Sequence, residues 1–254
     1  VCVYTSLRAI LETNNPERTA ICLFSDKEEI GSMGNTGMQS NVFDTFVAEL
    51  LNKLMVNRPN LLDKVFCNSR MLSADVDAAV DPLYVGAHDL TNDGKLSHGV
   101  SVNKYTGSGG KYNASDANAE FVAFIRRIFN ENNVNYQFSE LGKVDQGGGG
   151  TIAYILANKG VDVIDCGVPV LSMHAPYEVT SKVDIYSAYN AYKAFFNKRN
   201  KNIIIPNTGT PSSNIKKISK NSIAKIDYYN NLYKYDSSSI PNNIKIGRAS
   251  LGKE

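Results

Sequence analysis

Two adjacent glutamates, Glu28 and Glu29, open the most chemically suggestive stretch of the chain. They stand in the run SDKEEIGS of residues 25–32, directly after an apolar stretch. Neighbouring carboxylates point in different directions, so one can bind a metal ion while the other faces a metal-bound water. Hydrolysis at neutral pH needs this pairing, because the cation lowers the pKa of water and the free carboxylate takes its proton. The alternative interpretation is a solvated acidic loop.

Two further residues have the chemistry of metal ligands. Asp75 lies in SADVD (residues 73–77) after an apolar stretch, and His174 lies in LSMHAPYE (residues 171–178) among apolar neighbours. A neutral imidazole binds a metal through one nitrogen while a carbonyl or carboxylate orients the ring through the other. The alternatives are a turn-capping aspartate and a buried, hydrogen-bonded core histidine.

Two glycine-rich stretches are candidates for ligand contact. Lys104 and Tyr112 flank GSGG (residues 107–110) and are candidates for holding a substrate carboxylate, with a surface hairpin as the alternative. Four glycines at 147–150 precede a predicted helix, whose N-terminus favours negative charge. This run lacks the Lys-Ser/Thr pair of a nucleotide loop and the GxGxxG spacing, so it does not favour nucleotide binding.

The elements that must position these residues alternate between apolar strands and amphipathic helices. This alternation predicts an α/β fold, a layered and mostly parallel sheet flanked by helices. Active groups in such a sheet lie where strands end, which is where Glu28–Glu29, Asp75 and His174 fall. The predicted strands are 19–24, 64–67, 71–76, 99–104, 134–138 and 161–166, and the predicted helices are 5–12, 40–56, a helix capped by Ser115 or Asp116, 151–158 and 183–196.

The composition excludes several classes of protein. The chain has 254 residues, of which 43% are apolar, and this content allows a full core rather than global disorder. No stretch approaches the ~20 apolar residues of a membrane-spanning helix, so we expect no membrane partner. The four cysteines are widely spaced without a CxxC pair, which predicts a reduced, cytoplasmic chain.

Charge is distributed unevenly along the chain. Residues 197–254 carry 11 basic and three acidic side chains, and the first 196 residues carry 16 basic and 22 acidic ones. We therefore predict a domain over residues 1–196 and a basic, Asn/Lys/Ile-rich, poorly ordered tail over 197–254. A basic tail can bind nucleic acid or acidic lipid. No nucleic-acid-binding signature accompanies these charges, and we expect no nucleic-acid partner.

Six pieces of the chain, taken in order, resemble the aspartyl aminopeptidase/aminopeptidase I family of zinc metallopeptidases. They are VCVYTSLRAI, FSDKEEIGS, SADVDAAVDP, KYNASDANAE, DQGGGGTIAYI and LSMHAPYEVTS, and they cover residues 1–196. The resemblance implies a zinc-exopeptidase-like fold and a metal-dependent aminopeptidase that hydrolyses N-terminal residues from peptides. It also implies a homo-oligomer in the complete protein.

The resemblance further implies a co-catalytic site with two metal ions. Glu28 would be the general base, Glu29 and His174 would bind one metal, and Asp75 would bind the other. Lys104 and Tyr112 match positions on the substrate side of the family's site. This mixed carboxylate and imidazole set suits Zn²⁺, with Co²⁺ or Mn²⁺ as alternatives.

Two departures from the family pattern qualify this interpretation. The family's first His and bridging Asp, and the dimerisation domain inserted between them, precede the segment that matches Val1. We therefore expect a C-terminal half that needs a missing N-terminal half, with little or no activity in isolation. The alternative is a catalytically inactive fragment that serves as an interaction or assembly module. Ala78 stands where aspartyl members carry a His, which leaves the preferred N-terminal residue open.

Overall fold

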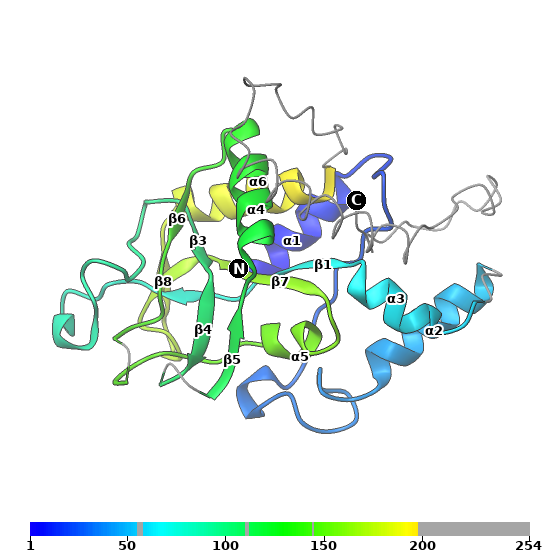
Figure 1. Cartoon of the computed structure of the whole chain (residues 1–254). Coiled ribbons are helices and arrows are strands. Elements are labelled where there is room, and N and C mark those ends of the chain that lie inside the picture. The colour runs from blue at the N-terminus through cyan, green and yellow to red at the C-terminus, as the bar shows by residue number, and fades with distance from the viewer. Residues whose placement is uncertain (55–57, 110–111, 144, 198–254) are drawn as a thin grey trace, which may run out of the picture. The chain divides into compact units, whose positions relative to one another are not determined.

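A computed structural model describes residues 1–54, 58–109, 112–143 and 145–197 of the chain (Figure 1). The predicted tail over 197–254 lies almost entirely outside these residues, so its order stays a prediction. None of the helices in the described part of the chain has the length and apolar character to cross a membrane.

A four-stranded sheet forms the centre of the fold. Its order is β1 (Arg70–Ser73), β7 (Asp162–Gly167), β3 (Val100–Asn103) and β6 (Tyr136–Phe138). The β1–β7 and β3–β6 pairs are parallel, and the β3–β7 pair is antiparallel. The sheet is thus mixed and rich in parallel pairs, which confirms the predicted α/β class.

Helices cover both faces of this sheet. Because side chains alternate along a strand, Ile164 and Cys166 of β7 belong to one apolar cluster and Val163 to another. The first cluster includes residues of α1 (Cys2–Leu11), α4 (Ala119–Glu131) and α6 (Lys182–Asn197). The second includes residues of α2 (Val42–Lys53), α3 (Leu61–Cys67) and α5 (Ala153–Ala157). Figure 1 shows α1, α4 and α6 on one side of β7 and α5 on the other.

Smaller elements extend from the ends of the sheet. A three-stranded sheet has the order β2 (Asp77–Ala78), β8 (Pro169–Leu171) and β9 (Val179–Thr180). The hairpin of β4 (Tyr105–Ser108) and β5 (Tyr112–Asp116) follows β3. Two short 3₁₀ helices, η1 (Glu28–Ile30) and η2 (Val85–Ala87), lie in the connections. These elements position the candidate site.

Several predicted elements differ from the structure. Residues 64–67 belong to α3, because Leu62, Val65 and Phe66 recur at helical spacing and pack into the second cluster. The cap of α4 is Asn118, whose side chain accepts a hydrogen bond from the Phe121 N–H, while residues 115 and 116 belong to β5.

The largest difference concerns residues 19–24, for which the sequence predicts a buried strand. They form no strand, and Leu23 and Phe24 are 43% and 46% exposed. A strand exists only where a neighbouring backbone pairs with it. No such partner for residues 19–24 is present in the described part of the chain.

Candidate active site

A tight turn presents Glu28 and Glu29. The two residues begin η1, which lies between Lys27 and Gly31, and both of these flanking residues have left-handed backbone angles with φ of 66° and 80°. The Gly31 N–H donates to the Glu28 carbonyl at 2.9 Å, and the Ser32 N–H donates to the Lys27 carbonyl at 2.8 Å. Glycine adopts such angles at little cost, whereas Lys27 is constrained into them by the turn. The turn therefore fixes the backbone positions of both glutamates, directly after residues 19–25.

His174 reaches Glu29 from the opposite half of the chain. Its Nε2 lies 3.3 Å from Glu29 Oε2, with the side chains 68% and 72% exposed. His174 also has a left-handed backbone, with φ of 66°. Its N–H donates to Glu178 Oε1 at 2.7 Å within the β8–β9 connection. Glu178 therefore holds the turn that carries the imidazole. The sequence interpretation missed this role, for which the His-x-x-x-Glu spacing is the available signal.

Asp75 follows β1 and is partly buried. Burial raises the pKa of its carboxyl, the Val76 N–H at 2.8 Å from its Oδ1 opposes that rise, and the charge of Glu29 adds to it. The charge of His174 lowers the pKa of Asp75. The field of both Glu29 and His174 thus reaches Asp75.

Glu28 belongs to the same electrostatic cluster. Burial raises its pKa most, the charges of Asp75 and Glu29 raise it further, and His174 opposes them. Glu28, Glu29 and Asp75 also line one cavity of about 330 Å³. The structure therefore brings together the four residues Glu28, Glu29, Asp75 and His174. A carboxyl with a raised pKa is suited to accept and return a proton near neutral pH.

The Glu29–His174 pair fits part of a zinc site. Two donor atoms on a tetrahedral Zn²⁺ with bonds of roughly 2.0–2.2 Å lie about 3.3–3.5 Å apart, and the observed separation is 3.3 Å. A zinc centre needs at least three protein ligands. Within residues 1–197, gaps excepted, no group of three or more His, Cys, Asp or Glu side chains is arranged to hold a metal. The donor chemistry fits zinc, and the described residues do not complete the centre.

Lys104 directly precedes β4 and Tyr112 begins β5, so both residues lie at the β4–β5 hairpin. Lys104 Nζ pairs with Asp116 Oδ1 across the hairpin, and both side chains are about half exposed or more. Tyr112 is 73% exposed. Among the contacts of the described residues, none joins either side chain to Glu28, Glu29, Asp75 or His174. The substrate-side role of these two residues stays a prediction.

The sequence interpretation missed a buried carboxyl, that of Asp165, which interacts electrostatically with Asp75. Asp165 of β7 is 6% exposed, and Thr106 Oγ1 donates to its Oδ2 at 3.1 Å. Burial raises its pKa to about 6, and the charge of Asp75 contributes to that rise. The available signal was an Asp near the end of the mostly apolar run VDVIDC (residues 161–166).

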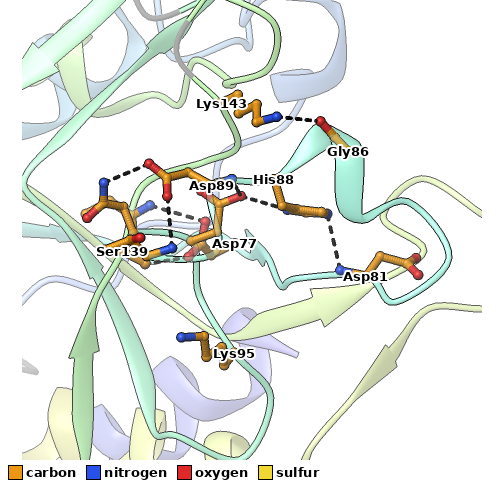
Figure 2. Close-up of polar contacts among 12 residues, drawn as sticks. Asp77, Asp81, Gly86, His88, Asp89, Lys95, Ser139 and Lys143 are labelled. Atoms are coloured by element: carbon orange, nitrogen blue, oxygen red, sulfur yellow. Dashed lines mark hydrogen bonds and ion pairs between the residues drawn. The ribbon is translucent and has the colours of Figure 1, made fainter.

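A polar network fixes the chain just beyond Asp75 (Figure 2). The buried Asp77 carboxylate accepts from Ser139 Oγ at 2.6 Å and from Asn103 Nδ2 at 3.2 Å. Figure 2 shows His88 between the residues around Asp77 and Asp81. The Asp81 N–H donates to His88 Nε2 at 3.2 Å. Because Nε2 accepts, the ring proton is on Nδ1, which lies 2.7 Å from a carboxylate oxygen of Asp93. The network ties β2 to β3 and so constrains the direction in which Asp75 leaves β1.

Comparison with protein families gives a match over residues 1–196. The matching family model is described as aminopeptidase I zinc metalloprotease (M18). The chain belongs to this family. This confirms the resemblance inferred from the six sequence pieces.

Individual M18 relatives agree with this assignment. A probable M18 family aminopeptidase 1 of Clostridium acetobutylicum is 52% identical over 197 residues, covering 78% of this chain and 42% of the relative. The crystal structure of aminopeptidase I from that organism has a TM-score of 0.71 to this chain. The M18 aminopeptidase structure from Thermotoga maritima is 47% identical with a TM-score of 0.75, and the match covers 78% of this chain and 44% of that one. The chain thus spans less than half the length of these M18 relatives.

Proposed function

We propose that this M18 chain supplies part of the catalytic centre of a metal-dependent aminopeptidase that removes N-terminal residues from peptides. The observation that carries the proposal is the cluster itself. An imidazole and a carboxylate lie 3.3 Å apart, beside two carboxyl groups whose pKa values are raised. The family description as zinc metalloproteases supports the same chemistry.

Each residue of the cluster has a role in this proposal. Glu29 and His174 would hold one Zn²⁺, and Asp75 would contribute to a second, with Co²⁺ or Mn²⁺ as alternatives. When bound, the two metal ions would supply an acidified water and polarise the scissile carbonyl. Glu28 would take the proton of the attacking water and return it to the leaving amine, a role that burial supports by raising its pKa above that of a free carboxyl. Lys104 and Tyr112 would contact the substrate.

A second candidate function follows from the incomplete ligand set. The described residues gather fewer than three metal ligands at any point, which favours a chain that has little activity unless further ligands join it. In that case the chain acts as an inactive fragment with an interaction or assembly role. For the complete protein we expect a cytoplasmic homo-oligomer acting on peptides.

Metal binding by the purified full chain tests the ligand assignment. Titration with Zn²⁺ against a chromophoric chelator should show that His174→Ala lowers the affinity about tenfold or more, in line with the loss of a direct ligand. His98→Ala is the matched control, because His98 is also exposed and its Nδ1 contacts only the Leu96 carbonyl among the bonds seen. Equal losses in the two variants would remove His174 from the site.

Turnover of Leu-anilide and Asp-anilide substrates separates the two candidate functions. A metal-loaded chain that cleaves either substrate, and loses that activity in Glu28→Gln, is the peptidase proposed here. Because we expect little activity of the chain in isolation, turnover is also measured after mixing it with a polypeptide that spans the part of the Clostridium acetobutylicum relative outside the match. Metal binding without turnover in this mixture supports the inactive fragment. Turnover that survives in Glu28→Gln would contradict the role of Glu28 as the base.

A further inference from the structure

The imidazole of His88 closes the loop of residues 81–88. Its Nε2 accepts the Asp81 N–H at 3.2 Å, so the last residue of the loop holds the first. The Asp81 N–H has no second acceptor among the described residues. This contact therefore fixes the point at which the chain enters the loop after β2.

A buried carboxylate holds the other side of the ring. His88 Nδ1 lies 2.7 Å from Asp93 Oδ2, and the two side chains are 10% and 0% exposed. The Asp89 N–H donates to the same oxygen at 3.1 Å. A backbone N–H can only donate, so the Nε2 that faces Asp81 carries no proton and the ring proton is on Nδ1. The two contacts together require a neutral imidazole.

A second ring proton is incompatible with the contact to Asp81. A protonated Nε2 is a donor, and it would face the Asp81 N–H, which is also a donor. The Asp81 carboxylate is not in place to accept this proton. Figure 2 shows it on the side of Asp81 away from the ring, and its Oδ1 accepts the Leu83 N–H at 2.8 Å. Protonation of His88 must therefore separate the ring from the Asp81 N–H.

The loop is the side of this contact that we expect to move. Asp93 is fully buried, and its Oδ2 faces both the ring and the Asp89 N–H. Leu83 and Tyr84 of the loop are instead 83% and 69% exposed. Exposed segments with few buried contacts open at a low cost in free energy. The imidazolium would stay with the Asp93 carboxylate, because hydrogen bonds between charged groups are the stronger ones.

The far end of the loop has a separate anchor. Lys143 donates from its Nζ to the Gly86 carbonyl at 3.0 Å and from its N–H to the Ala87 carbonyl at 3.3 Å. Neither contact involves the imidazole. Release should therefore be concentrated at residues 81–84.

Other ionisable groups surround the ring, and one of them titrates in the same range of pH. The charged side chains of the surrounding segments are Asp77, Asp81, Asp89, Asp93, Glu140 and Lys143. Burial raises the pKa of Asp77 to about 6. A test of His88 must therefore separate its protonation from that of Asp77.

We propose that His88 is an acid-sensitive contact: a second ring proton breaks its hydrogen bond to the Asp81 N–H and releases residues 81–84, while the pair with Asp93 remains. Imidazole is the side chain that ordinarily changes charge between about pH 5 and pH 8. The loop presents Leu83 and Tyr84 to solvent, so a partner that contacts them would meet an ordered loop at high pH and a released one in acid. This inference does not depend on the aminopeptidase activity proposed above.

Nitrogen NMR of the full chain, with a metal chelator present, tests the protonation state. At about pH 8 the His88 ring should have a protonated Nδ1 and an unprotonated Nε2, and acidification to about pH 5 should protonate Nε2. Amide exchange is measured on the same samples and corrected for its intrinsic dependence on pH. Protection of the Asp81 amide should fall about tenfold or more over the range in which His88 titrates. Amides of β3 should keep their protection, which excludes global unfolding as the cause.

A variant of His88 separates its effect from that of Asp77. His88→Gln keeps an oxygen that can accept the Asp81 N–H but gains no proton in this range, so protection of the Asp81 amide should no longer depend on pH. His98→Gln is the matched control and should keep the profile of the parent chain. His98 is exposed, and its Nδ1 contacts only the Leu96 carbonyl among the bonds seen.

Three results would overturn the proposal. A proton on Nε2 of His88 at about pH 8 would mean that the ring does not accept the Asp81 N–H. Constant protection of the Asp81 amide while His88 titrates would mean that the loop is not released. An equal loss of protection in His88→Gln and in the parent chain would assign the effect to another group, with Asp77 as the first candidate. The first two results come from the parent chain alone, so they stand even if His88→Gln does not fold.

Discussion

His174 and Glu29 face each other at 3.3 Å although they come from opposite halves of the chain. Each stands on or beside a left-handed backbone position, with φ of 66° at His174 and at Lys27 just before the glutamates. Non-glycine residues in this conformation are strained, and the surrounding structure must compensate. Two turns, rather than two regular elements, therefore set the geometry of the pair.

Glu178 should act as a positioning residue for His174. Its Oε1 accepts the His174 N–H at 2.7 Å. Glu178→Ala removes this acceptor and should lower Zn²⁺ affinity about threefold to tenfold, because the turn that carries the imidazole loses its support. Glu178→Gln keeps a carbonyl oxygen at the same place and should retain most of the affinity. A chelator-competition titration of both variants measures the difference, and identical affinities in Ala, Gln and parent chains would refute the role.

Regular elements were the most predictable part of this fold. Phe121, Ile125, Ile128 and Phe129 recur at helical spacing, and all four are fully or almost fully buried in α4. Residues 161–166 are recognisable as a strand because a short, mostly apolar run suits a central position between two helical layers. In both cases the local sequence pattern was sufficient, because the side chains that it predicts to be buried are buried in the structure.

Elements that depend on a distant neighbour were less predictable. Residues 19–24 have the composition of a buried strand, but pairing requires a second backbone that the described residues do not provide. In the site, Glu28, Glu29, Asp75 and His174 were identified because they follow predicted strands and match a family pattern. Glu178 was missed because its role is defined by one hydrogen bond within a turn.

Asp165 should make the stability of the chain depend on pH. Its pKa is raised to about 6 by burial, from an ordinary value of 3.8. The folded state therefore binds the proton more tightly than the unfolded state, and folding stability falls as pH rises through this window. In Asp165→Asn the part of that fall that Asp165 contributes should disappear, whereas the part due to Asp77, whose pKa burial also raises to about 6, should remain. The variant should gain roughly 3 kcal/mol relative to the parent chain between about pH 4 and pH 7.

Urea unfolding at several pH values measures this effect. The Thr106 hydroxyl can still donate to the amide oxygen of the substituted side chain, so the variant keeps the observed hydrogen bond. Asp63→Asn on α3 is the control, because Asp63 is exposed. Parallel pH profiles for Asp165→Asn and the parent chain would show that burial of Asp165 does not control this dependence.

Tyr192 should stabilise the packing of α6 against the sheet. Its hydroxyl donates to the Cys166 carbonyl at 2.7 Å, and its side chain is 2% exposed. Tyr192→Phe keeps the ring but removes a buried hydrogen bond, so the free energy of unfolding should fall by about 1–2 kcal/mol. Tyr186→Phe, on the same helix but 66% exposed, should change it by less than about 0.5 kcal/mol. Equal effects in the two variants, measured by urea unfolding, would contradict this assignment.

Lys104 should matter for substrate rather than for folding. Its ion pair with Asp116 is formed by side chains that are 49% and 61% exposed, and exposed pairs contribute little because water screens them. Lys104→Met keeps most of the aliphatic stem and should leave the midpoint of urea unfolding almost unchanged. If Lys104 holds a substrate carboxylate, the same variant should raise KM for an Asp-anilide substrate about tenfold in an active assembly, with kcat changed less. Asp116→Asn is the matched variant, since it breaks the same pair but leaves the cation. A KM that rises equally in both variants would show that the pair, and not the lysine's charge, is what the substrate requires.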